Sequence, residues 1–201
     1  PTTGALYMDG VRITGPGPDR GVVFQQYAVF PWLTVKENVQ FGLRLAANRK
    51  TAEEIDRISD HFIDLVNLED FKDSYPKELS GGMKQRVAIA RSYAVNPQVL
   101  LMDEPFGALD AQTRHFMQES LLQILEKERK TVVFVTHGVE EAAFLSTRVV
   151  IMAARPGRIR DVIPIDLPYP RDAATKTSPE FIKIRAGIEK VVREEFQKLR
   201  L

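Results

Sequence analysis

The sequence contains no cysteine, which excludes a disulfide framework and any thiolate chemistry. It has no surplus of one charge, because 28 lysines and arginines stand against 27 aspartates and glutamates, for a formal net charge of +1. This balance argues against a protein that binds nucleic acid through bulk electrostatics. No apolar run approaches the roughly 18 residues of a membrane span. What is present is an average composition over 201 residues, 44% hydrophobic and 27% charged, which is typical of a globular domain.

Apolar runs alternate with helical patterns in the second half of the chain. Residues 99–102, 131–136 and 148–154 are short apolar runs, and residues 111–129 have an amphipathic helical pattern. Uninterrupted runs of this kind predict buried strands of a parallel sheet with helices on both faces. The expected fold class is therefore α/β.

The first half of the chain carries turn and helix-start signals. Asp9-Gly10 predicts a two-residue hairpin turn, because both positions tolerate a positive φ. Thr34 and Thr51 each stand three residues before a glutamate, which is the spacing of a helix capping box. Ser178 followed by proline predicts the start of a last helix.

Two segments carry residues suited to chemistry. Asp103 and Glu104 follow an apolar run, and adjacent carboxylates at a parallel strand end suit a Mg²⁺ ion and a group that orients water. The alternative is an acidic turn that only aids solubility. Ser80, Gly81 and Gly82 precede a helical pattern, where free backbone N–H groups favour an anion. A flexible turn before a helix gives the same pattern.

Five motifs in one order join these segments: VFQQYAVFPWLTV, LSGGMKQR, VLLMDEP, GALD and VTHGVEEA. In this order they resemble the Q-loop, signature, Walker B, D-loop and switch-histidine regions of an ABC transporter ATP-binding subunit. The resemblance implies a P-loop NTPase (RecA-like) parallel-sheet core with an inserted helical subdomain and a small antiparallel β region. It divides the chain into a β remnant (1–24), the Q-loop and helical subdomain (25–97), the RecA-like core (98–166) and a helical tail (167–201).

The resemblance also implies residue roles for ATP hydrolysis with Mg²⁺. Glu104 would polarise the attacking water, and Asp103 would hold Mg²⁺ through water. Gln25 would sense both Mg²⁺ and the γ-phosphate, and His137 would contact the γ-phosphate.

A second group would act across a dimer interface, in a homodimer of this subunit. Ser80, Gly81 and Gly82, with Gln85 in the same segment, would close over ATP held by the opposite copy. Asp110 would signal across that interface.

The Walker A string, Gly-x-x-x-x-Gly-Lys-Ser/Thr, does not occur in the 201 residues, so the fold expected for them lacks the Walker A strand-loop-helix. Two interpretations stay open: a piece of a complete ATPase, inactive by itself, or a degenerate, non-hydrolysing subunit that acts in trans. The presence of Glu104 and His137 favours the first, because a subunit relieved of catalysis has no physical need for them.

The segments around His137, Pro156-Gly157 and Leu167–Asp172 resemble the nitrate/sulfonate/taurine group of bacterial importers. That group implies a peripheral subunit at the cytoplasmic face of the plasma membrane. It would contact a transmembrane permease through the Q-loop region, including Trp32, and a solute-binding protein only indirectly. A non-transport ABC ATPase is the alternative, although no long coiled coil separates Gln25 from the signature motif. No nucleic-acid partner is expected.

Overall fold

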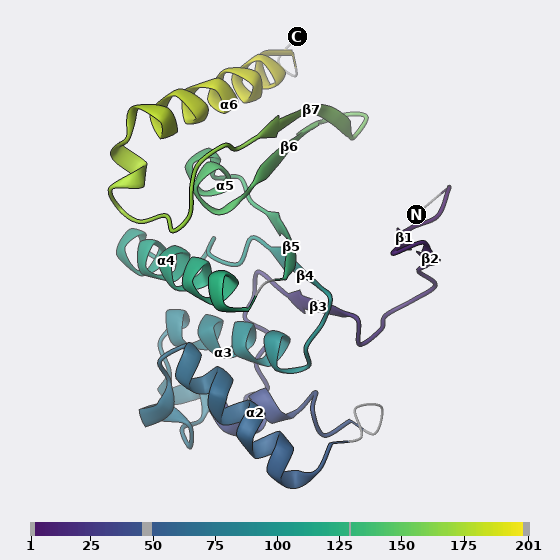
Figure 1. Cartoon of the computed structure of the whole chain (residues 1–201), viewed down its shortest axis with the longest axis vertical. Helices are drawn as coiled ribbons and strands as arrows, with labels where there is room; N and C mark the ends of the chain where they lie inside the picture. The colour runs from purple at the N-terminus through teal and green to yellow at the C-terminus, as the bar shows by residue number, and fades with distance from the viewer. Residues whose placement is uncertain (1–2, 46–49, 129, 199–201) are drawn as a thin grey trace.

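The computed structural model describes residues 3–45, 50–128 and 130–198, and its elements are stacked along the long axis of the molecule (Figure 1). Helices occupy one end, a three-stranded sheet lies in the middle, and a two-stranded sheet with the C-terminal helix forms the other end. The helices are α1 (Val35–Gln40), α2 (Ala52–Leu65), α3 (Gly81–Ala94), α4 (Ala111–Lys127), α5 (Val139–Leu145) and α6 (Pro179–Lys198). Short 3₁₀ helices are η2 (Glu69–Phe71), η3 (Pro76–Glu78) and η4 (Thr175–Thr177).

The middle sheet is parallel and has the order β3-β4-β5, with β4 in the centre. Its strands are β3 (Arg20–Val23), β4 (Val99–Asp103) and β5 (Thr131–Val135). Val23 lies opposite Met102, and Asp103 lies opposite Val135, so the three carboxyl ends meet at one edge. Ligands of such sheets bind beyond this edge.

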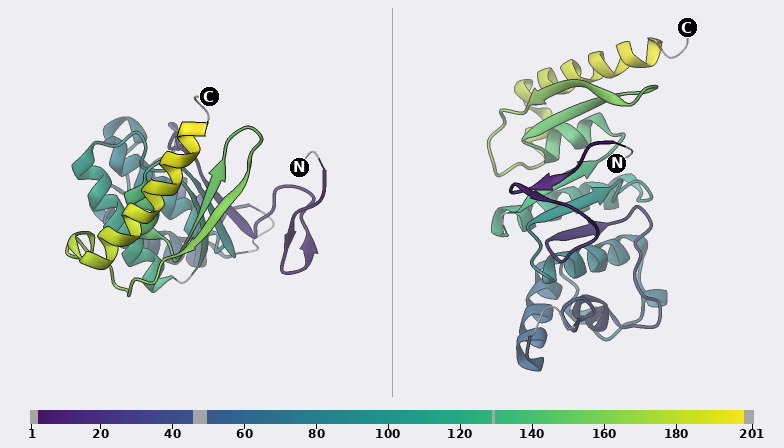
Figure 2. Two further views of the ribbon diagram at one scale, coloured as in Figure 1. Left: turned by 90° about the horizontal axis from the view of Figure 1, so that it is seen from above. Right: turned by 90° about the vertical axis from the view of Figure 1, so that its right-hand side faces the viewer.

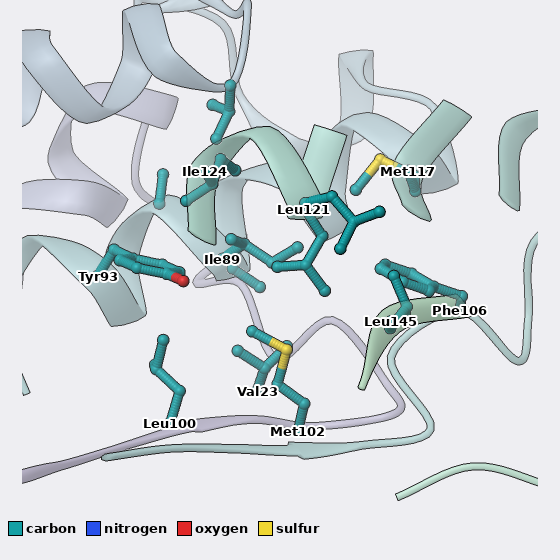
Figure 3. Packing of buried hydrophobic residues seen from close by; sticks show 14 of the residues in the cluster. Val23, Ile89, Tyr93, Leu100, Met102, Phe106, Met117, Leu121, Ile124 and Leu145 are labelled. Carbon is teal, nitrogen blue, oxygen red and sulfur yellow. The ribbon is translucent and has the colours of Figure 1, made fainter. Parts of the chain in front are cut away.

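One face of the sheet packs into the main hydrophobic core (Figure 3). Leu100 and Met102 of β4 are at most 1% exposed and point toward helices α3 and α4. Ile89 of α3 and Leu121 of α4 meet them from the other side. This packing fixes the height of both helices relative to the strand ends.

The second face of the sheet differs from the sequence-based expectation of helices on both sides. Val22, Val133 and Val135 are 39%, 51% and 49% exposed. Among the described ranges, α3 and α4 lie on the first face, and the hairpin of β1 (Tyr7–Met8) and β2 (Val11–Arg12) stands away from the sheet (Figure 2). The apolar runs arise because the strands are apolar on both faces, whereas these helices cover only one.

The local signals read from the sequence are confirmed. Asp9 and Gly10 have φ values of 48° and 78° between β1 and β2, as a two-residue hairpin requires. Thr34 and Thr51 both form complete capping boxes, at the starts of α1 and α2. Ser178 accepts a hydrogen bond from the N–H of Phe181 at the start of α6.

The C-terminal part is held together by antiparallel pairing and ion pairs. Strands β6 (Arg148–Ala153) and β7 (Arg158–Pro164) pair with each other, and α6 lies alongside them (Figure 1). Arg160 of β7 contacts the carboxylates of Glu194 and Glu195 on α6. No helix in the described ranges combines the length and the apolar content needed to cross a membrane.

A buried arginine connects this C-terminal part to α5. Arg171 is 4% exposed, and its guanidinium lies 4.1 Å from the ring centre of Tyr169. It donates hydrogen bonds of 2.8–3.3 Å to the backbone carbonyls of Ala143, Phe144, Ser146 and Leu167. Three of these carbonyls belong to the end of α5, where a helix leaves its carbonyl groups without partners.

Replacing Arg171 by methionine therefore removes the donors for four carbonyl groups while preserving most of the side-chain volume. We expect Arg171→Met to lower the free energy of unfolding by roughly 2–4 kcal/mol, measured by urea unfolding followed by circular dichroism. Arg193→Met, at an exposed position of α6, is the matched control and should change it by less than about 0.5 kcal/mol. Equal effects of the two substitutions would contradict this role of Arg171.

Candidate active site

Three side chains from three different loops meet at the carboxyl edge of the sheet. Gln25 follows β3, Glu104 follows β4 and His137 follows β5. Nε2 of His137 lies 2.7 Å from Oε1 of Glu104, and Nε2 of Gln25 donates to Oε2 of Glu104 at 3.4 Å. The structure thus brings together the three residues predicted to be catalytic, with Glu104 at the centre.

The backbone of Glu104 is held in an unusual conformation. Its φ is +43°, in the left-handed region that costs a non-glycine residue about 1 kcal/mol or more. The N–H of Glu104 donates to the carbonyl of Val135 at 2.9 Å, and its own carbonyl accepts from Gly107 at 3.1 Å. These bonds to β5 and to the next turn hold the carboxylate at the sheet edge.

The two partners in the closest contact differ in exposure. The side chain of Glu104 is 24% exposed, whereas that of His137 is 87% exposed. A carboxylate of this kind, partly withdrawn from solvent and touched by an imidazole, can accept a proton from a water molecule above the edge. Few atoms surround the imidazole, so its position depends on the turn that carries it.

Asp103 suits a metal ion that retains most of its water. It is exposed at the end of β4, beside Glu104. The described residues contain no cluster of three or more histidine, cysteine, aspartate or glutamate side chains arranged around a metal. Mg²⁺ usually takes only one or two protein carboxylates, with phosphate oxygens and water as the other ligands. A single exposed Asp103 fits that donor set.

The signature segment lies at the start of α3. Ser80 is its N-cap, and its hydroxyl oxygen accepts a hydrogen bond from the N–H of Met83 at 3.3 Å. A side chain at Gly81 would come within 2.9 Å of the Tyr27 hydroxyl, and one at Gly82 within 2.7 Å of a Thr113 methyl group. The glycines thus let α3 approach the Q-loop and α4 closely. Ser80 remains exposed at a helix start that favours anions.

Of the remaining two predicted residues, Asp110 caps a helix and Gln85 lies in the protein interior. Asp110 caps α4, because its Oδ1 accepts from the N–H groups of Gln112 and Thr113 at 3.1 and 3.0 Å. Hydrogen bonding to Thr113 is the largest influence that holds the pKa of Asp110 below its usual value. Gln85 is fully buried, and neither polar atom of its amide has a hydrogen-bond partner in the described structure. The structure does not bring Gln85 to the surface with Ser80.

The signature residues and the catalytic residues are two groups with different contacts in the described part of this chain. Among the described residues, no hydrogen bond or ion pair joins Ser80 to Glu104. Ser80 of one group and His137 of the other are exposed, so neither group encloses a ligand alone.

The Q-loop presents aromatic side chains to solvent. Trp32 is 69% exposed and its ring centre lies 5.6 Å from that of Phe30, which in turn packs against Phe41 at 4.4 Å. Asn38 of α1 is fully buried and bonds to three carbonyl groups of the loop, including that of Phe30. The guanidinium of Arg91 lies 4.9 Å from the Phe30 ring centre. The buried Asn38 side chain therefore holds the loop against α1, while Trp32 is exposed to solvent.

Sequence reasoning assigned no role to Glu141, although it lies within the VTHGVEEA motif. Its carboxylate is buried and accepts a hydrogen bond from the hydroxyl of Thr136, next to His137. The only signal in the sequence is an acidic residue at a position that the helix buries, which becomes evident once the packing of α5 is known.

Comparison with known proteins agrees with the motif-based resemblance. Residues 1–107 match the ABC transporter family. The chain is 58% identical over 185 residues to the ATP-binding protein BAB2_1147 of Brucella abortus, covering 92% of this chain and 70% of that protein. It is 48% identical over 199 residues to the nitrate import ATP-binding protein NrtD of Synechocystis sp., covering 96% and 74% of the two chains. Identity to the aliphatic sulfonates import ATP-binding protein SsuB of Bacillus cereus is 50% over 185 residues, covering 92% and 70%.

A solved structure confirms the fold class. The dimeric, post-hydrolysis structure of the ATP-binding cassette MJ0796 bound to ADP and Pi superimposes with a TM-score of 0.67 at 32% identity, covering 83% of this chain and 75% of that one. The shared fold, the family match and the relatives show that this chain belongs to the ABC transporter family.

Proposed function

We propose that this chain supplies the hydrolytic residues Glu104, His137 and Gln25 to the ATP-hydrolysing subunit of an importer for a small anion such as nitrate, a sulfonate or taurine. The observation that supports hydrolysis is the 2.7 Å contact between His137 and Glu104, with Gln25 on the other carboxylate oxygen. The names of the nitrate and sulfonate import relatives support the anion class. A subunit that only binds nucleotide would have no use for a carboxylate held in a strained turn beside an imidazole.

In the proposed reaction, Glu104 accepts a proton from a water molecule whose oxygen attacks the γ-phosphorus of ATP. The bond between the γ-phosphorus and the bridging oxygen breaks, and ADP and inorganic phosphate leave. His137 contacts the γ-phosphate and holds the carboxylate through Nε2. Gln25 donates to the other carboxylate oxygen and so limits its rotation. Positioning and electrostatics supply the rate enhancement, as in phosphoryl transfer generally.

Mg²⁺ would neutralise charge on the β- and γ-phosphates when bound, and we assign Asp103 to hold it through water, with Gln25 nearby. Asp103 is the last residue of β4 and Glu104 follows it directly, so the two adjacent carboxylates divide these tasks.

We further propose that the signature group acts on ATP held by a second copy of this subunit. Ser80 is exposed at a capped helix start, with Gly81 half-buried and Gly82 buried behind it, and no hydrogen bond joins Ser80 to Glu104 in the described structure. Asp110 connects to them, since Gly82 packs on Thr113, which Asp110 caps. Gln85 would support the segment from within, where it is buried. The 201 residues contain no Walker A string, so we propose that they hydrolyse no ATP by themselves.

The Q-loop surface is the proposed contact with a transmembrane permease, at the cytoplasmic face of the membrane. Trp32 projects from a loop that Asn38 fixes, and it lies seven residues after Gln25 in the same loop. Exposed aromatic side chains on a fixed base are typical anchors of protein interfaces. A solute-binding protein would then act through the permease only.

Substituting Glu104 by glutamine tests the hydrolytic assignment in the intact transporter complex. We expect Glu104→Gln to lower kcat by about 10²–10⁴-fold, because an amide cannot accept the proton, while ATP binding persists. ATP turnover and nucleotide affinity are the measurements. Glu126→Gln, at an exposed position of α4, is the control and should leave turnover unchanged. Unchanged turnover in Glu104→Gln, or a parent complex without ATPase activity, would refute the hydrolytic role and leave a non-hydrolysing subunit.

Trp32→Ala tests the permease contact. We expect it to weaken assembly with the permease by roughly tenfold or more, because a central aromatic anchor contributes about 2 kcal/mol to an interface. Co-purification and transport in vesicles measure the loss. Phe196→Ala, at an equally exposed aromatic of α6, is the control and should not affect assembly. If Trp32→Ala lowered transport only as far as its lower thermal stability reduces the amount of folded protein, the contact would be excluded.

A further inference from the structure

The carboxylate of Glu141 is buried and uses both of its oxygens. Glu141 is 9% exposed in the first turn of α5. Its Oε1 accepts from Nε2 of Gln118 at 2.9 Å, and its Oε2 accepts from the hydroxyl of Thr136 at 2.5 Å. A buried carboxylate is costly unless such donors satisfy it, so its presence calls for an explanation.

The Thr136 hydroxyl extends this arrangement across His137. While it donates to Glu141, the same oxygen accepts from the N–H of Gly138 at 2.9 Å. The residues before and after His137 are thereby fixed by one side chain. The imidazole itself is 87% exposed, and its one polar contact in the described structure is that with Glu104. The direction in which His137 points therefore depends on this turn.

The orientation of the network is set from the C-terminal tail. Lys176 donates to Oε1 of Gln118 at 2.8 Å, and its ammonium lies 4.5 Å from the ring centre of Phe144. An ammonium group can only donate, so the amide oxygen of Gln118 faces Lys176 and its amide nitrogen faces Glu141. The hydrogen bonds from Lys176 to Gln118 and from Gln118 to Glu141 then run in one direction, and the bond from Thr136 reaches Glu141 from the other side.

The N-cap of α5 supplies no side chain to fix the turn, although the Gly138 carbonyl accepts a helical hydrogen bond from Ala142. Gly138 is the N-cap of α5 and makes no side-chain capping bond. A side chain there would come within 3.3 Å of Glu141 Cβ and 3.4 Å of the Thr136 hydroxyl, so these two residues pack closely around Gly138.

We propose that Glu141 is a positioning residue for His137, acting through the Thr136 hydroxyl and held in place by Gln118 and Lys176. The inference rests on the proposed role of His137 in ATP hydrolysis. It assigns no contact between Glu141 and the nucleotide. It adds that the C-terminal tail contributes, through Lys176, to the geometry of the site.

Glu141→Gln removes one acceptor from the network without changing its size. In the intact transporter complex, we expect it to lower kcat by about tenfold and to leave KM within about twofold, because only the orientation of His137 changes. The Gly138 amide, observed by NMR in the isolated chain, should exchange with solvent about tenfold faster. A capping role limited to stability would lower the melting temperature but not kcat.

Exchanging the two side chains should restore the network. In the double variant Gln118→Glu/Glu141→Gln, the new carboxylate accepts from Lys176 and from the new amide nitrogen. The new amide oxygen accepts from Thr136. We expect kcat and Gly138 exchange to return to within about threefold of the parent values, whereas Gln118→Glu alone places two carboxylates together and lowers kcat.

Thr136 provides a second pair of variants should the exchanged pair fail to fold. Thr136→Val removes the hydroxyl at constant volume and should behave like Glu141→Gln, whereas Thr136→Ser keeps the hydroxyl and should behave like the parent. Parental kcat and Gly138 exchange in Glu141→Gln or Thr136→Val would overturn the proposal. The proposal would also fail if kcat stayed low in the double variant and fell equally in Thr136→Ser and Thr136→Val.

Measuring kcat together with Gly138 amide exchange distinguishes the positioning role of Glu141 from the hydrolytic role of Glu104. If Glu104→Gln leaves turnover unchanged, the proposed function fails. Gly138 exchange and the chemical shifts of the His137 imidazole still show whether Glu141 fixes the turn. If those signals respond and kcat does not, the positioning of His137 for hydrolysis is refuted.

Discussion

Hydrogen bonding between the parallel strands β3, β4 and β5 determines where every candidate catalytic side chain lies. The register places Val23, Met102 and Phe134 side by side, so the loops that follow begin at the same height. Gln25, Glu104 and His137 therefore meet although they are far apart in the sequence. The bond from the Glu104 N–H to the carbonyl of Val135 continues this pairing one residue beyond the ladder. A one-residue slip of β5 would separate the imidazole from the carboxylate.

Helix α3 links the core to the surface group that contains Ser80. Its buried side chains, such as Ile89, pack on the sheet, while its first turn carries two glycines that allow contact with Tyr27 and α4. Packing on the sheet therefore fixes the position of α3, and α3 in turn fixes the position of Ser80 relative to the Q-loop. Ser80 makes no hydrogen bond to Glu104 in the described structure, and we propose that it serves the site of a second copy.

Local features were predictable from neighbouring residues, whereas among long-range contacts only the meeting of Gln25, Glu104 and His137 was anticipated, through the motif resemblance. The Asp9-Gly10 hairpin and the capping boxes of Thr34 and Thr51 depend on neighbouring residues only. The strand-end position of Glu104 followed from an apolar run. By contrast, the bond between Gln118 and Glu141 and the bonds from Arg171 to the end of α5 join residues more than 20 positions apart. No periodicity reports such contacts. The apolar runs indicated a sheet buried on both faces, because side-chain polarity does not say whether a covering layer lies above a strand.

We propose that hydrolysis takes place where Glu104 of one copy meets Ser80 of another. Mixing two inactive variants in the intact complex tests it most directly. Ser80→Asp keeps a good helix cap but repels phosphate, and Glu104→Gln removes the proton acceptor. A shared site predicts that an equal mixture regains up to about a quarter of parental ATP turnover, since half of the dimers are mixed and each holds one intact site. A mixture as inactive as either variant alone would contradict a site shared between two copies.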